Sequence, residues 1–104
     1  MTVAIDYDIR QIVAITGGEL QASGYKAEIE YLSVDSRKIN NPAATLFWAI
    51  KTGQRDGSVF IMDLYKKGVR NFVTQTPGYC RSLKGANVII VKNALEALQK
   101  LAAH

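Results

Sequence analysis

Two short polar segments carry residue types suited to binding an anionic or sugar-containing ligand, and each follows an apolar run. Residues 51–57, KTGQRDG, follow the run at 46–50 and hold two glycines and two cations, Lys51 and Arg55. Residues 35–37, Asp-Ser-Arg, end a second run. A helix N-terminus after a buried strand attracts anions, and the two cations would add to that field. KTGQRDG therefore predicts an anion site of low specificity, with an ordinary strand-to-helix turn as the alternative.

Several kinds of catalytic site are excluded by residue type. KTGQRDG lacks the Gly-Lys-Ser/Thr ending of a Walker A loop and the spacing of G-x-G-x-x-G. The only cysteine is Cys80, which excludes an internal disulfide or a cysteine zinc site. The only histidine is the last residue, which excludes a Ser-His-Asp mechanism within one chain. Cys80 is interpreted as an incidental loop thiol whose pKa is lowered somewhat by Arg81.

The composition is that of an ordinary globular domain. The 104 residues are 48% hydrophobic and 21% charged, which suits one domain with a single core. The net charge of +4 suits an anionic ligand but does not by itself argue for nucleic acid. No apolar run approaches the roughly 20 residues that span a bilayer, and the N-terminus lacks a signal-peptide pattern. We therefore expect a cytoplasmic protein with no membrane insertion and no nucleic-acid partner.

Strand and helix patterns alternate along the chain. Three helices are predicted: one between Asp8 and Gly17, one that Ser58 caps and Gly68 ends, and one that Asn93 caps. A turn is predicted at residues 23–24, and strands at residues 19–21, 29–34, 46–50, 71–74 and 88–91. The buried face of the last helix is expected to hold Leu95, Leu98, Leu101 and Ala102.

The strand at 46–50, the second helix and the strand at 71–74 form a strand–helix–strand unit, which implies a parallel pair. The predicted fold class is α/β, a single small domain with a mixed β-sheet flanked by helices. The last helix runs to the end of the sequence without a stop signal. We therefore expect one domain of a longer protein, with a natural terminus that frays as the alternative.

The order of these motifs resembles the N-terminal domain of the Mur ligases, which add amino acids to the peptidoglycan precursor. The family pattern is a strand ending in Asp-Ser-Arg, a strand Leu-Phe-Val-Ala-Leu, a loop with Asp-Gly, a helix and a Gly-Val step. Here the matching segments are residues 35–37, LFWAI at 46–50, residues 52–57 and Gly68-Val69. The resemblance covers almost the whole chain and implies the fold of that domain.

Within the family, LFWAIKTGQRDG followed by DLYKKGVRNFV is most similar to ligases that add D-alanyl-D-alanine to the UDP-N-acetylmuramoyl tripeptide, in a version fused to alanine racemase. Two alternatives remain open. One is the sister ligase that adds the third amino acid. The other is a non-catalytic interaction domain that binds no nucleotide.

The resemblance implies that residues 1–104 form the substrate domain, which holds the UDP end of a UDP-N-acetylmuramoyl peptide. Contacts to uracil or ribose are expected from the backbone of Val34 and the hydroxyl of Ser36, and a contact to pyrophosphate from Arg55. The uridine is expected to be covered by Thr52, Gly53 and Gln54. Supporting roles at the strand end and at the turn are expected for Asp35, Arg37, Asp56 and Gly57.

The resemblance also implies which parts are absent from this chain. The ATP-binding and C-terminal domains would lie outside it, so ATP and Mg²⁺ belong to the parent ligase, and pyridoxal phosphate to a fused racemase. The chain alone is expected to have no catalytic residue, cofactor or metal, to be inactive, and to contact the ATP-binding domain of the same parent. Two residues depart from the family pattern. Trp48 replaces a small apolar residue and is interpreted as core, and Ser58 stands where the family often has His.

Overall fold

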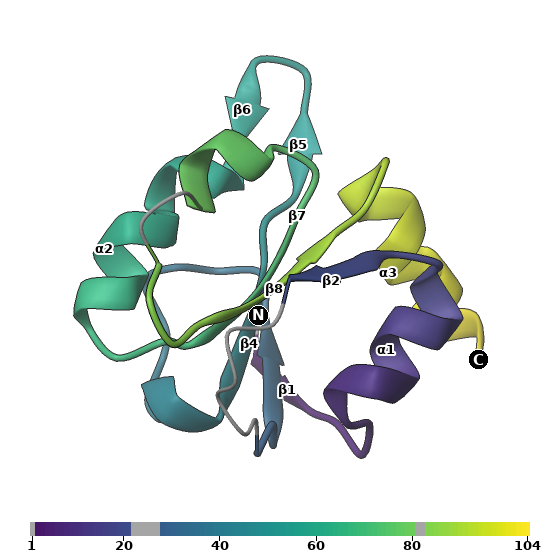
Figure 1. Cartoon of the computed structure of the whole chain (residues 1–104), viewed down its shortest axis with the longest axis horizontal. Coiled ribbons are helices and arrows are strands. Elements are labelled where there is room, and N and C mark those ends of the chain that lie inside the picture. The colour runs from purple at the N-terminus through teal and green to yellow at the C-terminus, as the bar shows by residue number, and fades with distance from the viewer. Residues whose placement is uncertain (1, 22–27, 81–82) are drawn as a thin grey trace.

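The computed structural model describes residues 2–21, 28–80 and 83–104, so the turn predicted at 23–24 lies outside the described residues. A single sheet runs through the molecule, with helices on both of its faces (Figure 1). The strands of this sheet are β1 (Thr2–Ala4), β2 (Glu19–Gln21), β3 (Tyr31–Ser33), β4 (Thr45–Trp48), β7 (Asn71–Thr74) and β8 (Asn87–Ile90).

The helices are short. The α-helices are α1 (Ile9–Thr16), α2 (Ile61–Lys66) and α3 (Ala94–Ala103), and the 3₁₀ helices are η1 (Pro42–Ala44), η2 (Gly57–Phe60) and η3 (Pro77–Cys80). None of the helices in the described part of the chain combines the length and the apolar character that crossing a bilayer requires.

The sheet has six strands in the order β1-β3-β4-β7-β8-β2. The four central strands, β3, β4, β7 and β8, are parallel, and the edge strands β1 and β2 are antiparallel to their neighbours. Both β4 and β7 are buried along their whole length, as expected for strands covered on both faces. This arrangement confirms the predicted mixed sheet and the parallel strand–helix–strand unit. The strand β1 was missed because its residues are all exposed and show no alternation.

Each face of the sheet has its own apolar core. Leu46 and Trp48 point to the face covered by α1 and α3, whereas Phe47 and Phe72 point to the face covered by α2. Trp48 is completely buried, and its indole Nε1 donates a hydrogen bond of 2.8 Å to the carbonyl oxygen of Ala94. The interpretation of Trp48 as core is therefore confirmed, and its hydrogen bond fixes the start of α3 on the sheet.

Two of the three predicted helix caps are confirmed. Asp8 caps α1 in a capping box with Gln11, and the Asn93 side chain accepts a hydrogen bond from the backbone of Glu96 at the start of α3. The cap predicted at Ser58 is wrong. A 3₁₀ helix, η2, precedes α2 there and is capped by Asp56, while Ser58 is buried inside it.

The buried face of α3 also differs from the prediction. Leu95 is 39% exposed and Ala102 is exposed, whereas Ala94, Ala97 and Leu101 are buried. The buried residues are spaced by three and four positions, as expected for one face of a helix, and two of them are alanines. The prediction was right for Leu101 and for Leu98, which packs against the same core. It was wrong for Leu95 and Ala102, because it followed the larger leucines and missed Ala94 and Ala97.

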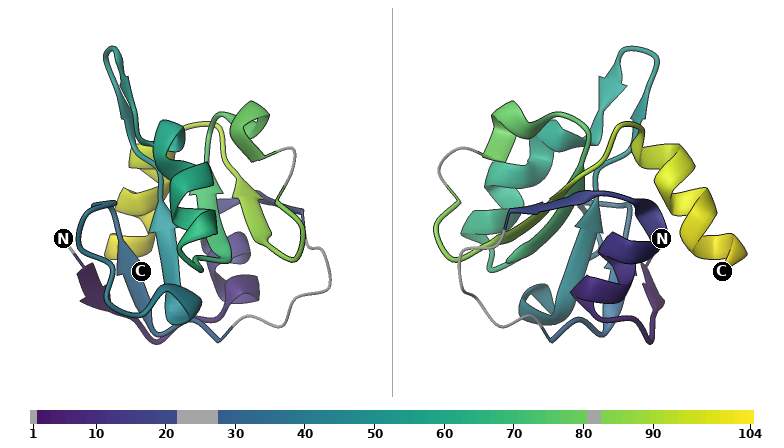
Figure 2. Two further views of the ribbon diagram at one scale, coloured as in Figure 1. Left: turned by 90° about the vertical axis from the view of Figure 1, so that its left-hand side faces the viewer. Right: turned by 45° about the vertical axis from the view of Figure 1, so that its right-hand side comes forward.

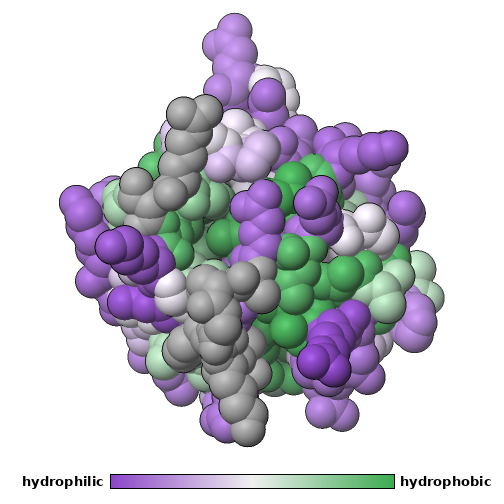
Figure 3. Space-filling view, in the orientation of Figure 1, coloured by the Kyte–Doolittle hydropathy of each residue, from purple (hydrophilic) through white to green (hydrophobic). Residues whose placement is uncertain are grey.

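The segment KTGQRDG forms a β-hairpin, not a plain turn. Its strands are β5 (Lys51–Thr52) and β6 (Arg55–Asp56), joined through Gly53 and Gln54. Gly53 has a φ of 57°, a left-handed conformation that suits glycine. The hairpin projects from the body of the domain in every view (Figure 2), and its surface is hydrophilic (Figure 3).

Candidate functional site

A cavity of about 570 Å³ lies at the carboxyl ends of β3 and β4, beside the base of the hairpin. Ligands of open α/β sheets bind at this edge, beyond the carboxyl ends of the strands. The cavity is lined by Val34, Asp35, Ser36, Arg37, Phe47, Ile50, Arg55, Gly57 and Phe60. It therefore brings together the two polar segments that the sequence singled out.

The Asp-Ser-Arg segment is shaped by the last residue of β3. The buried Ser33 hydroxyl donates to the carbonyl oxygen of Asp35 at 3.0 Å and accepts from the backbone N–H of Asp35 at 3.2 Å. Such local bonds favour a turn over a continued strand. Thr2 on β1 also donates its hydroxyl hydrogen to Ser33, at 3.1 Å. Ser33 thus bends the chain so that Ser36 reaches the cavity.

Asp35 and Arg37 form an ion pair within this turn. The guanidinium of Arg37 donates from Nε to Oδ1 at 3.2 Å and from Nη2 to Oδ2 at 3.4 Å, and its backbone N–H donates to Oδ1 at 2.9 Å. The side-chain hydrogen bond from Arg37 is the main cause that holds the pKa of Asp35 below its ordinary value. The same bond raises the pKa of Arg37. These bonds lie within the turn itself, and the expected role of the pair in bracing the strand end stays a prediction.

The base of the hairpin is held by Asp56. Its carboxylate accepts from the backbone N–H of Ser58 at 2.9 Å and from the hydroxyl of Thr76 at 2.7 Å. Burial opposes ionisation of Asp56, but the hydrogen bonds from Thr76 and Ser58 outweigh it and lower its pKa. The Ser58 hydroxyl lies 2.6 Å from that of Thr74, and both are fully buried. These bonds tie the hairpin and η2 to the end of β7.

Gly57 lies at a close approach of two backbone segments. A Cβ there would meet the backbone N of Ile50 at 3.2 Å and the Cα of Ala49 at 3.3 Å. Its backbone N–H donates to the carbonyl oxygen of Ile50 at 2.9 Å. Only a residue without a side chain fits here without displacing the backbone that forms the cavity floor.

The predicted site residues fall into three groups. Most of them line the cavity, namely Val34, Asp35, Ser36, Arg37, Arg55 and Gly57. Asp56 supports the cavity from behind through its bonds to Ser58 and Thr76. Thr52, Gly53 and Gln54 are exposed on the hairpin and are not among the lining residues.

Sequence reasoning missed part of the cavity wall. Phe47 and Ile50 line the cavity but were predicted only as part of the strand at 46–50, and Phe60 lines it but was given no role in the site. Phe60 is 45% exposed, which does not fit a core role. The sequence carried no warning of this, because Phe60 stands four residues before Leu64, a spacing that places both residues on one face of a helix.

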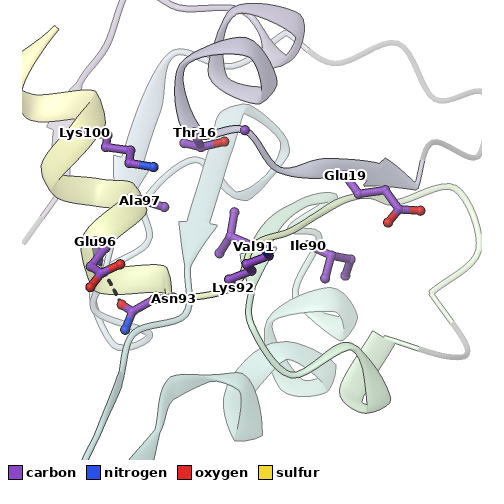
Figure 4. Close-up of a pocket in the computed structure, with 10 residues that line it drawn as sticks. Thr16, Glu19, Ile90, Val91, Lys92, Asn93, Glu96, Ala97 and Lys100 are labelled. Atoms are coloured by element: carbon purple, nitrogen blue, oxygen red, sulfur yellow. Dashed lines mark hydrogen bonds between the residues drawn. The ribbon is translucent and has the colours of Figure 1, made fainter.

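A second cavity, of about 460 Å³, lies between the end of α1 and the start of α3 (Figure 4). Its charged lining mixes both signs, with Lys92 and Lys100 beside Glu19 and Glu96. The hydroxyl of Thr16, which also lines it, donates to the carbonyl oxygen of Ile12 at 2.8 Å. Because its two lysines are balanced by its two glutamates, this lining has no excess of positive charge to attract an anionic ligand.

The residues near the hairpin do not form a phosphate loop for ATP. The segment after β4 is a paired hairpin, and α2 has only six residues. Within the described ranges, no group of three or more His, Cys, Asp or Glu side chains is arranged to hold a metal ion. Burial raises the pKa of Cys80 to about 11, so the predicted lowering by Arg81 is not the dominant effect, and Arg81 itself lies outside the described residues.

These features define a small α/β domain with a cavity at the carboxyl edge of a mixed sheet. The family model described as "Mur ligase family, catalytic domain" matches residues 28–104. Because this match spans more than half of the chain, the chain belongs to the Mur ligase family. No curated protein sequence matches the chain in a direct comparison.

Solved structures with a similar fold come from Acinetobacter baumannii. Two crystal structures of MurF superpose with TM-scores of 0.74 and 0.75, and a UDP-N-acetylmuramoylalanyl-D-glutamyl-2,6-diaminopimelate–D-alanyl-D-alanyl ligase with 0.75. Each is 18% identical and matches 96% of this chain. The chain spans 21% of the length of each of these proteins. The predicted fold class is therefore confirmed.

Proposed function

We propose that residues 1–104 form the substrate domain of a Mur ligase and that its cavity holds the UDP end of a UDP-N-acetylmuramoyl peptide. The observation that carries this proposal is the convergence of the Asp-Ser-Arg turn and the hairpin base on one cavity. Its volume of about 570 Å³ lies in the range of small-molecule sites, roughly 300–1,000 Å³.

The chemistry of the lining suits a nucleoside diphosphate. The Ser36 hydroxyl offers a donor and an acceptor for a ribose or base, and Arg55 offers a cation for the diphosphate. Arg37 also lines the cavity, but its guanidinium is already paired with Asp35. Arg55 is therefore the better candidate for the phosphate contact. On the hairpin, Thr52, Gly53 and Gln54 would cover the uridine only if ligand brings them toward the cavity.

We further propose that the parent enzyme uses ATP to drive the formation of an amide bond, as the family resemblance implies. ATP and Mg²⁺ would be held by an ATP-binding domain of the same parent, and the present chain would supply the grip on the UDP end. The chain alone would then have no ligase activity. ATP hydrolysis by the purified 104-residue chain, stimulated by the UDP-linked substrate, would contradict this division of roles.

We infer which group the parent ligase adds from the sequence of the hairpin region. LFWAIKTGQRDG favours the D-alanyl-D-alanine step and a parent fused to alanine racemase, which would use pyridoxal phosphate. The test is an assay of the parent protein with UDP-N-acetylmuramoyl tripeptide and D-alanyl-D-alanine. Incorporation of a third-position amino acid into the dipeptide precursor instead would assign the chain to the sister ligase.

Calorimetric titration of the chain with UDP and with uridine tests the binding role. Replacing Arg55 by Gln should weaken UDP binding by about tenfold or more, because a charge-assisted hydrogen bond contributes about 1.5–3 kcal/mol. Uridine binding should stay within about twofold, since uridine has no phosphate. Lys92→Gln is the matched control, because it removes the same charge at the second cavity. Equal losses of UDP affinity in both variants would show that the Arg55 charge attracts UDP from a distance and does not contact its diphosphate.

A domain that binds no nucleotide is the competing function. It predicts no heat and no saturation with UDP or UDP-N-acetylmuramic acid at millimolar concentration. Affinity of the single domain will be lower than that of the parent, because contacts to the rest of the substrate are missing. The titration therefore extends to several millimolar before binding is judged absent.

A further inference from the structure

Phe60 is the accessible aromatic group of the cavity. Two aromatic residues line the cavity, and Phe47 is only 1% exposed because it packs in the core beneath α2. Phe60 ends η2 and is 45% exposed. Of the two rings, only that of Phe60 can offer its face to a ligand.

We infer that Phe60 is the platform on which the nucleobase of the bound nucleotide stacks, an inference that rests on the proposed UDP site. The lining of the cavity includes the apolar side chains of Phe60 and Ile50 and the polar side chains of Ser36 and Arg55. A nucleoside diphosphate combines the same two kinds of group, with a flat base at one end and a charged diphosphate at the other. Bases stack on aromatic side chains, and phosphates pair with arginine.

The structure holds this platform in place before any ligand binds. Asp56 caps η2 at its first turn, and the buried Ser58 hydroxyl fixes its middle to Thr74. Ile61, directly after Phe60, is fully buried and anchors the chain on the other side. A ring mounted between such anchors loses little conformational freedom on binding, which favours affinity.

The platform also places the base. The hairpin residues 52–54 are exposed and lie outside the cavity lining, whereas Phe60 is part of the wall. The base therefore rests on the η2 wall, and the hairpin can contribute only from above. Because every base has an aromatic face, Phe60 selects a base-bearing ligand over a bare phosphate, and does not by itself distinguish uracil from cytosine.

The test follows the uracil H5 and H6 proton signals while UDP is titrated with the chain, alongside the affinity. In the wild type and in Phe60→Tyr, ring current from the stacked aromatic should shift both signals upfield. In Phe60→Leu, which keeps an apolar side chain, the shift should vanish and UDP should bind about tenfold more weakly. Binding of inorganic pyrophosphate should be the same in all three. Tyr79→Leu, at an aromatic of similar exposure outside the cavity, is the matched control and should behave as wild type.

The outcomes separate this inference from the proposal beneath it. UDP binding at the cavity with equal affinity and equal uracil shifts in wild type and Phe60→Leu would overturn the stacking role and leave the UDP site intact. An absence of UDP binding in the wild type would overturn the UDP site and the stacking role with it. Amide spectra of each variant establish that the fold outside the cavity is unchanged.

Discussion

Replacing Asp56 by Ala removes the carboxylate that fastens the hairpin and η2 to the sheet. The change deletes a cap on the Ser58 N–H and a bond of 2.7 Å from the Thr76 hydroxyl. Loss of an N-cap costs about 0.5–2 kcal/mol, and a hydrogen bond to a charged group about 1.5–3 kcal/mol. Asp56 is only partly buried and water can replace some of this, so we expect a loss of about 1–3 kcal/mol.

The assay is urea unfolding followed by circular dichroism, with thermal unfolding as a second measurement. For a domain of this size the expected loss lowers Tm by about 5–20 °C. Asp6→Ala is the control, because Asp6 is an exposed carboxylate on the loop before α1 and should change stability by less than about 0.5 kcal/mol. An Asp56→Ala loss no larger than that of the control would refute the view that this carboxylate holds the hairpin base.

The same pair of proteins gives a pH test. The pKa of Asp56 is lowered in the folded state, so its ionised form stabilises the fold at pH values above the unfolded pKa of about 3.9. That contribution is lost as the pH falls through the folded pKa. The stability difference between wild type and Asp56→Ala should therefore be full at pH 7 and shrink as the pH falls below about 4. A difference that grows on acidification would contradict this sign.

Three further changes test other parts of the structure. Trp48→Ala should destabilise the fold by about 3–5 kcal/mol, because it removes a fully buried ring and its bond to Ala94, and urea unfolding measures this. Gly57→Ala should cost about 1–3 kcal/mol by crowding the backbone and should also weaken UDP binding. Gly85→Ala, at an open left-handed turn outside the cavity, should cost about 1–2 kcal/mol and leave UDP binding unchanged, and reversed binding effects would count against the cavity. The half-buried Cys80, with its pKa raised to about 11, should react with iodoacetamide at pH 7.5 at least about tenfold more slowly than the unfolded chain does, and equal rates would show that burial does not suppress its thiolate.

The sequence predicted the central strands and two helix caps well, for physical reasons. The runs at 46–50 and 71–74 are apolar because β4 and β7 are covered on both faces. Asp8 and Asn93 have the side-chain oxygens that free helix N–H groups require. These signals are local, and they can be read without knowing the rest of the fold.

The errors lie where distant residues decide the structure. Ser58 has the right chemistry for a cap, but its hydroxyl pairs with Thr74 on another strand, and Asp56 takes the cap instead. The hairpin was missed because its strands have only two residues each, too few to show alternation. Phe60 was overlooked as a wall of the cavity, since an aromatic beside a helix stripe resembles core until the helix is placed.

The central claim is that the cavity at the ends of β3 and β4 binds the UDP end of the substrate. The most direct test maps backbone amide shifts of the ¹⁵N-labelled chain during titration with UDP-N-acetylmuramic acid. The account predicts saturable shifts that cluster at Ser36, Arg55 and Gly57. Shifts that cluster around Thr16 and Lys100 at the second cavity, or no shifts at several millimolar ligand, would contradict it.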